Sequence, residues 1–340
     1  MSGAERYLRQ TNLPEVGAAG QARLSSAHAL VLGAGGLAAP VLQYLAGAGL
    51  GRLSIIDPDR VELSNLHRQT LFTEADQGRP KAEAAAAFCT RLNGDVRADG
   101  IVAAFDPASA PALVQAADLV LDCTDSFAAK YVASDACMAA GKPLFSASVL
   151  GLDGYAAGFC DGAPSYRALF PELPESARTC ASAGVLGPVV GMIGSLQAQM
   201  AMTWILGLDP SPLGQFLRYE GGPMRFSSFR FDGAPEPAGG PRFIAPGQIT
   251  EADDVLDLRP ASEAPHPVAP HANRRDAEDT SPLTPRPGRR LVLACRSGLR
   301  AARAARHLPP DWQGEVVLVA AGDPLTHDMN RSDQPTGKKQ

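Results

Sequence analysis

Short apolar runs alternate with longer alanine- and leucine-rich segments along the first 150 residues of the chain. The runs that have the length of buried strands lie at 28–32, 52–56, 118–122 and 143–147. The segments long enough for helices lie at 37–48, 81–92 and 126–140. Strands that alternate with helices in this way build a mostly parallel sheet with helices on both faces. The pattern therefore predicts an α/β domain with a Rossmann-like sheet.

The pattern changes in the second half of the chain. Residues 215–231 read as an antiparallel pair of strands turning at Gly221-Gly222, which would extend the sheet. A smaller α/β unit follows, with expected strands at 255–258, 291–294 and 316–319 and a basic helix ending at His307. The predicted parts are a first domain at 1–232, a glycine- and proline-rich linker at 233–246, a second domain at 247–323 and a disordered tail at 324–340.

The composition narrows the class of protein. The chain of 340 residues is 45% hydrophobic and 20% charged, as is ordinary for a soluble globular protein. Its formal net charge is -5, and no basic block would bring it to nucleic acid or to an anionic membrane. The apolar stretch 181–208 is interrupted by Gln197 and Gln199, which favours a buried helix over a membrane span. Six scattered cysteines and no secretory signal before Gly3 predict reduced thiols in the cytoplasm.

The first predicted strand ends in a glycine-rich turn of the kind that binds phosphates. The turn contains Gly33, Gly35 and Gly36, and backbone N–H groups in such a turn approach phosphate oxygens closely. The second strand ends at Asp57-Pro-Asp59, and Asp57 lies 21 residues after Gly36. At that interval an acidic side chain reaches a ribose hydroxyl. These two features alone would also fit a NAD-dependent oxidoreductase.

Two cations and a further strand-end carboxylate indicate a triphosphate instead. Arg68 and Lys81 have no obvious use in a dinucleotide site, whereas both can neutralise charge on a triphosphate as pyrophosphate leaves. Asp125 follows the strand at 118–122, and Mg²⁺ prefers one or two carboxylates together with phosphate oxygens. Taken singly, either cation is more often ordinary surface. Their joint occurrence with the turn and both acids predicts a site for ATP and Mg²⁺.

These motifs together resemble the ThiF/MoeB/HesA family, the bacterial relatives of ubiquitin-activating enzymes. The resemblance covers about the first 230 residues of the chain. Its motifs, in chain order, are Arg6-Tyr-Leu-Arg9-Gln10, the Gly33 turn, Asp57-Pro-Asp59, Ser64-Asn65-Leu-His-Arg68-Gln69, Gly78-Arg-Pro-Lys81, Asp122-Cys-Thr-Asp125, Thr179-Cys180 and residues 184–194.

The resemblance implies an enzyme that adenylates the C-terminal glycine of a ubiquitin-like sulfur-carrier protein ending in Gly-Gly, with release of pyrophosphate. It implies that Asp57 binds the ribose, that Asp125 holds Mg²⁺, and that Arg9 reaches the active site of the other subunit of a homodimer. The other residues expected at the nucleotide are Gly33, Gly35, Gly36, Asp59, Asn65, Arg68, Gln69 and Lys81. Carriers that serve molybdopterin, thiamine, cysteine or tRNA thiolation share this tail, and their globular surfaces decide the pairing.

Two cysteine features of the family differ in how well this chain matches them. Cys180 matches the family's loop cysteine, which accepts the activated carrier or a sulfur atom, and Arg178 is a nearby cation that would favour its thiolate. The alternative is an inert loop cysteine. Family members commonly hold a structural zinc with two Cys-x-x-Cys pairs. This chain has Ser165-Tyr-Arg-Ala168 at the first pair and no Cys-x-x-Cys anywhere, so we predict no zinc site.

The second unit resembles a rhodanese-like domain in a degenerate form. Cys295-Arg296-Ser-Gly-Leu-Arg300 follows a strand and opens a helix, where backbone N–H groups can hold a thiolate or persulfide and the arginines add positive charge. The resemblance covers about 80 residues and is broken at 260–290. It implies either a persulfide on Cys295 that attacks the carrier adenylate, or an idle thiol. A separate cysteine desulfurase is the other source of sulfur considered, and the fused unit favours molybdopterin-type or dual-use sulfur mobilisation.

Three functions follow from these observations. The leading interpretation is an ATP-dependent adenylyltransferase of a sulfur carrier with a fused sulfur-transfer unit. A NAD-dependent oxidoreductase would leave Arg68, Lys81 and Cys295 unexplained. A non-catalytic scaffold that binds the carrier or a nucleotide would explain the missing zinc ligands but not the intact phosphate-handling residues.

Overall fold

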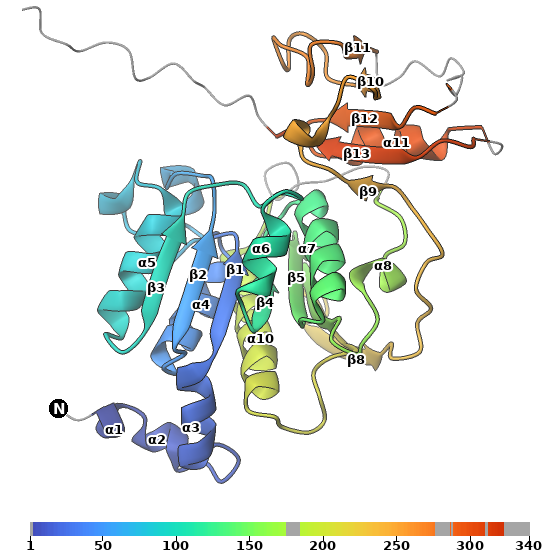
Figure 1. Cartoon of the computed structure of the whole chain (residues 1–340). Coiled ribbons are helices and arrows are strands. Elements are labelled where there is room, and N and C mark those ends of the chain that lie inside the picture. The colour runs from blue at the N-terminus through green and yellow to red at the C-terminus, as the bar shows by residue number, and fades with distance from the viewer. Residues whose placement is uncertain (1–2, 175–183, 276–285, 287, 310–311, 323–340) are drawn as a thin grey trace, which may run out of the picture. The chain divides into compact units, whose positions relative to one another are not determined.

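The structure is a computed structural model of the chain, and it describes all residues except 1–2, 175–183, 276–285, 287, 310–311 and 323–340. The chain forms two compact units, Met1–Ile244 and Ala245–Gln340, whose elements are labelled in Figure 1. The boundary between the units falls inside the segment 233–246 that the sequence predicts as a linker. Each unit has a sheet of its own.

The first unit is built on one eight-stranded sheet in the order β3-β2-β1-β4-β5-β6-β7-β8 (Figure 1). The first five strands in this order are parallel, and β6, β7 and β8 each pair antiparallel with the strand before. The predicted Rossmann-like sheet with an antiparallel extension is confirmed. The strands are β1 (His28–Leu32), β2 (Arg52–Ile56), β3 (Arg97–Ile101), β4 (Leu119–Asp122), β5 (Leu144–Leu150), β6 (Asp153–Phe159), β7 (Gln215–Glu220) and β8 (Arg225–Arg230).

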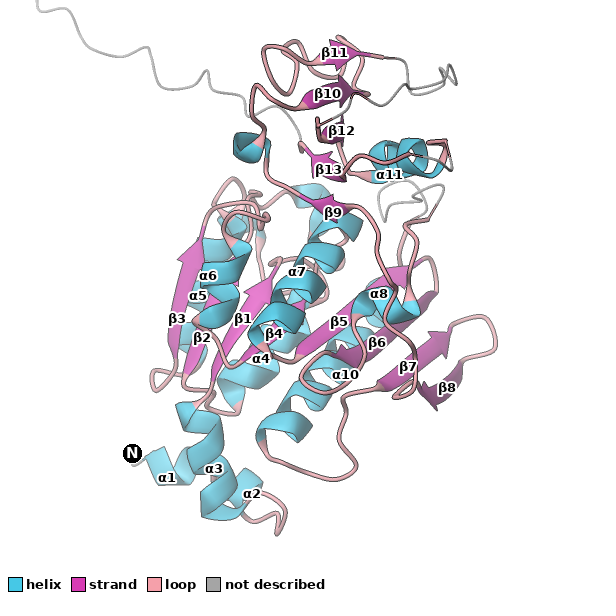
Figure 2. Ribbon diagram, turned by 45° about the vertical axis from the view of Figure 1, so that its right-hand side comes forward, coloured by secondary structure: helices cyan, strands magenta, loops and turns pink. Residues whose placement is uncertain are grey.

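Helices cover both faces of this sheet (Figure 2). α4 (Ala38–Gly47), α5 (Lys81–Leu92) and α10 (Gly187–Ile205) lie on one face, and α6 (Ala110–Gln115) and α7 (Phe127–Ala140) lie on the other. The shorter elements are α1 (Gly3–Arg6), α2 (Leu8–Thr11), α3 (Gly17–Ser26), η1 (Leu63–Asn65), η2 (Glu74–Asp76), α8 (Tyr166–Leu169) and β9 (Arg242–Phe243). Within the described part of the chain, no helix combines the length and the apolar character needed to cross a membrane.

The central strands form the core because their side chains are covered on both faces. β1, β2 and β4 are buried along almost their whole length. The edge strand β3, Arg97-Ala-Asp-Gly-Ile101, is half-exposed and has no apolar run, so the sequence pattern missed it. Gly100 lets this strand lie close to α5, since a Cβ there would be 2.6 Å from the Ala82 backbone oxygen. α5 has the predicted bounds, and Pro80 is its N-cap.

The second unit is a small parallel sheet with one helix. Its strands in spatial order are β11 (Asn273–Arg274), β10 (Asp254–Asp257), β12 (Leu291–Cys295) and β13 (Val316–Ala320), each parallel to the next. The short η3 (Pro246–Gln248) precedes β10, and α11 (Leu299–Arg306) follows β12 and packs on β12 and β13. The three predicted strands and the basic helix of this unit are therefore present.

Candidate active site

The glycine turn follows β1, at the point of the sheet where the order of the strands reverses and β4 lies next to β1. β1 pairs with β2 on one side and with β4 on the other, and α/β sheets bind ligands at the carboxyl ends of strands at such a point. Gly33, the first residue after β1, has a φ of 83°, and a Cβ there would lie 3.2 Å from the Cys123 backbone oxygen. The Gly33 N–H donates to the Ile56 carbonyl at 2.8 Å. The turn is therefore held between the ends of β2 and β4 and requires glycine.

The segment that follows η1 packs directly on the next two glycines. A Cβ at Gly36 would lie 3.2 Å from the Arg68 backbone oxygen and 2.7 Å from Val190 Cγ1. A Cβ at Gly35 would lie 3.6 Å from Gln69 Nε2. The missing side chains thus allow the turn and the Arg68–Gln69 backbone to approach each other. The structure brings these two predicted parts of the nucleotide site together.

Arg68 is half-buried and is held by side chains of its own segment. Its Nη2 donates to Asn65 Oδ1 at 2.7 Å, and its Nη1 lies 2.9 Å from His67 Nε2. A guanidinium has five N–H donors, so these contacts leave donors for an anion. The bond to Asn65 fixes the side chain before any anion is present.

Gln69 carries a buried polar atom without a partner. The residue is 5% exposed, and among the described residues nothing hydrogen-bonds to its Oε1. An unpaired buried polar atom costs about 1–3 kcal/mol, so such an atom commonly marks a place for water or a ligand. The amide can present either its oxygen or its NH₂ group by rotation. This side chain, next to Gly35, therefore fits a site that a bound ligand completes.

Asp57 joins the end of β2 to the glycine turn. Its Oδ2 accepts a hydrogen bond from the Ala34 N–H at 2.7 Å, and its Oδ1 accepts one from the Asp59 N–H at 2.7 Å. Burial raises the pKa of Asp57, and these hydrogen bonds together with the charge of Lys81 oppose that rise. Each carboxylate oxygen keeps a further lone pair for a hydroxyl donor. Asp57 can therefore accept hydrogen bonds from a hydroxyl group beside the turn.

Lys81 is tied to the same group through Asp59. Its Nζ lies 2.9 Å from Asp59 Oδ2, and its backbone N–H donates to the Asp59 carbonyl at 2.8 Å. Lys81 is only 5% exposed, whereas the Asp59 side chain is 65% exposed. An ammonium has three donors, and this pair uses one of them. The described contacts therefore connect the turn, Asp57, Asp59 and Lys81 in one hydrogen-bonded chain.

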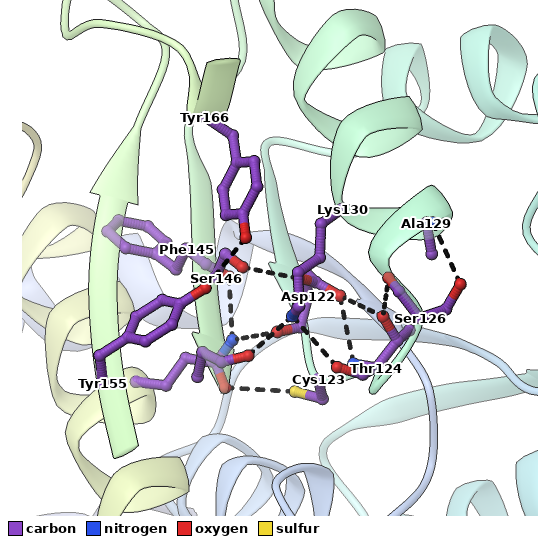
Figure 3. Close-up of polar contacts among 12 residues, drawn as sticks. Asp122, Cys123, Thr124, Ser126, Ala129, Lys130, Phe145, Ser146, Tyr155 and Tyr166 are labelled. Carbon is purple, nitrogen blue, oxygen red and sulfur yellow. Dashed lines mark hydrogen bonds and ion pairs between the residues drawn. The ribbon is translucent and has the colours of Figure 1, made fainter. Parts of the chain in front are cut away.

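A buried polar cluster lies at the end of β4, beside the loop that carries Asp125 (Figure 3). The fully buried Asp122 carboxylate pairs with Lys130 Nζ at 2.7 Å. Thr124 links this loop to the turn, since its Cγ2 would be 3.3 Å from a Cβ at Gly33. Asp125, the next residue, is exposed. An exposed carboxylate beside the turn fits a hydrated cation such as Mg²⁺.

The sequence analysis missed the buried ion pair between Lys130 and Asp122. A signal was available, because this lysine stands in the largely apolar segment 126–140, directly after a strand that ends in Asp122. A charge on an apolar face of a helix needs a buried partner, and the acid at the preceding strand end is the nearest candidate.

Arg9 lies away from this site in its own chain. Arg9 is exposed on α2, and the neighbouring Gln10 donates to the Ala48 carbonyl, just past the last residue of α4. α4 begins beside the glycine turn, and its 10 residues span about 15 Å. Figure 1 shows α2 at the end of the unit where β1 begins, whereas the turn follows the other end of β1. The structure therefore does not bring Arg9 to the site of its own chain.

The positions of the family's first zinc pair hold other side chains. The Ser165 N–H and Oγ donate to the two carboxylate oxygens of Glu236 at 2.6 and 2.5 Å. Ala168 has only a methyl group, and its N–H donates to Ser165 Oγ. A bonded hydroxyl and a methyl group do not fit a four-thiolate zinc site. No group of three or more His, Cys, Asp or Glu side chains suited to a metal ion occurs in the described ranges. That the protein binds no zinc remains a prediction.

Cys295 lies at the end of β12 in the second unit, where the chain turns into α11. Its Sγ accepts a hydrogen bond from the Gly298 N–H at 3.1 Å, and the residue is fully buried. Arg300 pairs with Glu263 at 2.5 Å and also donates to the Leu258 carbonyl. The Arg300 guanidinium, which this carboxylate balances, also interacts with the Cys295 thiol, as the sequence predicts. Cys180, the other predicted sulfur residue, lies outside the described residues.

The remaining described cysteines are buried in the first unit. Burial raises the pKa of Cys89 and Cys160 to about 12, and it raises the pKa of Cys123 and Cys137 as well. These thiols therefore stay protonated at neutral pH, as suits cysteines that serve packing. None of the five cysteines that the structure describes forms a disulfide.

Comparison with known proteins identifies the family of the first unit. The ThiF family matches residues 7–238. The adenylyltransferase and sulfurtransferase MOCS3 of Bos taurus is 46% identical over 218 residues, which are 63% of this chain and 48% of that protein. The SAMP-activating enzyme E1 of Haloferax volcanii is 40% identical over 234 residues, which are 68% of this chain and 87% of that protein. The chain spans about half the length of the MOCS3 proteins that it matches.

Solved structures show the same fold at lower identity. The structure of E. coli MccB with ATP has a TM-score of 0.59 at 21% identity, and the match covers 70% of this chain and 75% of that one. The structure of PaaA has a TM-score of 0.57 at 21% identity, with 68% of this chain and 74% of that one covered. Because the ThiF match covers more than half of the chain, this protein belongs to the ThiF family.

Proposed function

We propose that the first unit uses ATP to adenylate the C-terminal carboxylate of a ubiquitin-like sulfur-carrier protein. The observation that carries the proposal is the convergence on one glycine turn of a buried acid, two cations and an exposed acid. Asp57 bonds to the turn, and Lys81 is linked to Asp57 through Asp59. Arg68 packs on Gly36, and Asp125 follows the residue that contacts Gly33. A nicotinamide dinucleotide would use the turn and Asp57 alone.

Each group has a separate part in the proposed reaction. Asp57 accepts hydrogen bonds from the ribose, and backbone N–H groups of the turn bind phosphate oxygens. Arg68, held by Asn65, and Lys81 bind the phosphates and stabilise the negative charge that grows as pyrophosphate leaves. Gln69 completes its hydrogen bonding on the bound nucleotide. Mg²⁺ held at Asp125 would supply charge neutralisation on the phosphate oxygens.

The second substrate in this proposal is a protein tail. A carrier carboxylate oxygen attacks the α-phosphorus, a new P–O bond forms, and the bond to the pyrophosphate oxygen breaks. The products are the carrier acyl-adenylate and pyrophosphate. The name of the Haloferax relative, a SAMP-activating enzyme, supports activation of a protein modifier. A tail ending in Gly-Gly suits the turn, because residues without side chains allow close approach of the backbone.

We further propose a homodimer in which each site takes Arg9 from the other subunit. Support comes from the placement of α2, about 15 Å along α4 from the turn of its own chain. An exposed arginine that cannot reach the phosphates of its own site remains available to a second copy. The resemblance to the ThiF/MoeB/HesA family assigns it this role.

A second activity, sulfur transfer from Cys295, is favoured by one observation. Sγ accepts a hydrogen bond from the Gly298 N–H where α11 begins, and this arrangement stabilises a thiolate or persulfide. In the proposed step the terminal persulfide sulfur attacks the carbonyl carbon of the carrier adenylate, AMP leaves, and an acyl disulfide joins the carrier to Cys295. A second thiol then attacks Cys295 Sγ, a disulfide forms at that sulfur, and the carrier leaves as the thiocarboxylate. Because the residue is fully buried, the loop has to open for this step. Replacing Cys295 by Ala should abolish thiocarboxylate formation if Cys295 is the sulfur donor. If Cys180 or a separate cysteine desulfurase is the donor, the variant should form the thiocarboxylate at the wild-type rate.

The test of adenylation is carrier-dependent exchange of labelled pyrophosphate into ATP. The purified protein is mixed with ATP, Mg²⁺ and a panel of carriers ending in Gly-Gly, each paired with a control that lacks the last glycine. Exchange with at least one complete carrier and with none of the truncated controls supports the proposal. ATP binding without exchange for any carrier supports the scaffold alternative. Binding of NAD in preference to ATP supports the oxidoreductase.

A further inference from the structure

The Asp122 carboxylate is surrounded by donors from three parts of the chain (Figure 3). Oδ2 accepts hydrogen bonds from Lys130 Nζ at 2.7 Å and from Ser146 Oγ at 2.6 Å. Oδ1 accepts them from the Thr124 N–H at 3.1 Å and from Thr124 Oγ1 at 2.7 Å. Asp122 and Ser146 are fully buried, and Lys130 is 1% exposed. The cluster is therefore shielded from solvent and fully hydrogen-bonded.

Lys130 has no donor left for a ligand. Its Nζ donates to Asp122 Oδ2, to the Ala147 carbonyl at 2.8 Å and to the Thr124 carbonyl at 3.1 Å. These acceptors use all three N–H groups of the ammonium. Burial alone would lower the pKa of Lys130, but the charge of Asp122 raises it above its ordinary value. Lys130 therefore remains a cation and acts through the groups that it holds.

Thermal stability is a poor explanation for this pair. Removing two charges from water is expensive, and well-packed apolar side chains in place of a buried ion pair are often equally stable or more stable. A buried pair does provide direction, because each hydrogen bond fixes the position of the group at its other end. In this cluster the group at the other end is the loop that carries Asp125.

The loop is fixed on both sides of Asp125. Thr124 is held at its N–H, its hydroxyl and its carbonyl by Asp122 and Lys130, and its methyl group lies against the turn at Gly33. Ser126 is the N-cap of α7, and its side chain accepts a hydrogen bond from the Ala129 N–H. Between these two fixed residues Asp125 presents an exposed carboxylate.

We propose that Lys130 and Asp122 are positioning residues that hold Thr124, and with it the Asp125 carboxylate, at the distance from the glycine turn that a metal–nucleotide complex requires. This inference rests on the proposed ATP site. It predicts that loosening Thr124 weakens the contribution of Mg²⁺ to nucleotide binding and leaves metal-free nucleotide binding unchanged. In an active site, a misplacement of about 1 Å can lower the reaction rate about 10²-fold.

Two matched variants separate positioning from stability. Thr124→Val removes one hydroxyl bond to Asp122 Oδ1 and loosens the loop, which keeps its two backbone bonds. Ser146→Ala removes one hydroxyl bond to Oδ2 of the same carboxylate, and Ser146 lies on β5, outside the loop. Both should lower the melting temperature to a similar extent. Lys130→Met removes both the ion pair with Asp122 and the hydrogen bond to the Thr124 carbonyl. If Lys130→Met fails to fold, the Thr124→Val variant decides the question.

The readout is the affinity for ATP by calorimetry, measured with Mg²⁺ and again with EDTA. We expect Thr124→Val to lose about tenfold or more of the Mg²⁺-dependent tightening, with Ser146→Ala like the wild type. Equal behaviour of the two variants, or an intact Mg²⁺ effect in Thr124→Val, would overturn the inference. Wild-type protein that binds Mg²⁺-ATP but shows no carrier-dependent exchange would refute the adenylation proposal and still leave this comparison decisive. Wild-type protein without ATP affinity would refute both.

Discussion

The replacement Arg68→Ala can test catalysis separately from folding stability, because the Arg68 side chain makes few contacts with the rest of the fold. Its side-chain hydrogen bonds among the described residues go to Asn65 and His67, both in its own segment, and the side chain is only half-buried. Losing such bonds costs about 0.5–1.5 kcal/mol of folding stability. Losing a preorganised donor at a charge that grows during the reaction costs about 10²–10³-fold in rate, or about 2.7–4 kcal/mol. The variant should therefore fold normally and adenylate poorly.

The assay is pyrophosphate exchange at saturating ATP and carrier, with thermal melting as the check on folding. Arg79→Ala is the matched control, since Arg79 lies in the same region and is paired with Asp76 at the surface. We expect its exchange rate to stay within about twofold of the wild type, as for an exposed ion pair without a catalytic role. An unchanged rate in Arg68→Ala would refute the reasoning, as would an equal loss in Arg79→Ala.

Three further predictions concern the dimer, the position of the missing zinc pair and the second unit. If Arg9 acts across a dimer, Arg9→Ala and Arg68→Ala should each be nearly inactive in pyrophosphate exchange. An equimolar mixture of the two variants, refolded together, should regain about a quarter of the wild-type exchange rate, because half of the dimers are mixed and each mixed dimer has one intact site. No recovery would show that Arg9 does not act in the site of the other subunit. Glu236→Ala should lower the free energy of unfolding in urea by about 1–2 kcal/mol, because it removes two hydrogen bonds to Ser165. Glu236→Gln should lower it less. An unchanged urea midpoint in Glu236→Ala would show that this contact does not stabilise the fold. Burial would raise the pKa of Asp257, but hydrogen bonds from Arg259 and the Val268 N–H lower it below 3.8, so its stabilisation is present above that pH and is lost as the pH falls through the lowered pKa. Melting of the second unit, followed by Trp312 fluorescence in a Trp204→Phe background, should therefore shift down in acid, and Asp257→Asn should flatten that shift.

The parallel core and the glycine turn were predictable from sequence because neighbouring residues determine them. An apolar run with the length of a strand, followed by Gly33 and an alanine-rich helix, specifies β1, the turn and α4 without long-range information. The interval from Gly36 to Asp57 is one helix and one strand, so the contact of Asp57 with the Ala34 N–H follows from the fold. The placement of Lys81 follows in the same way.

The contacts that could not be predicted join residues far apart in the chain. Ser165 and Glu236 are 71 positions apart, and nothing in the local pattern of either indicates the other. Ser146 lies 24 positions after Asp122, and it reaches that carboxylate from β5 because β5 pairs with β4. β3 and β6 were missed because an edge strand and a glycine-containing strand need little apolar surface of their own when neighbours cover them.

The most direct test of the central claim is the chemical state of the carrier after reaction. A carrier ending in Gly-Gly is incubated with the protein, ATP and Mg²⁺, and its intact mass is measured before and after treatment with hydroxylamine. We predict AMP attached through the C-terminal carboxylate, its conversion to a hydroxamate by hydroxylamine, and neither product with Arg68→Ala. An unmodified carrier across the whole panel, with ATP bound at the glycine turn, would contradict the proposal.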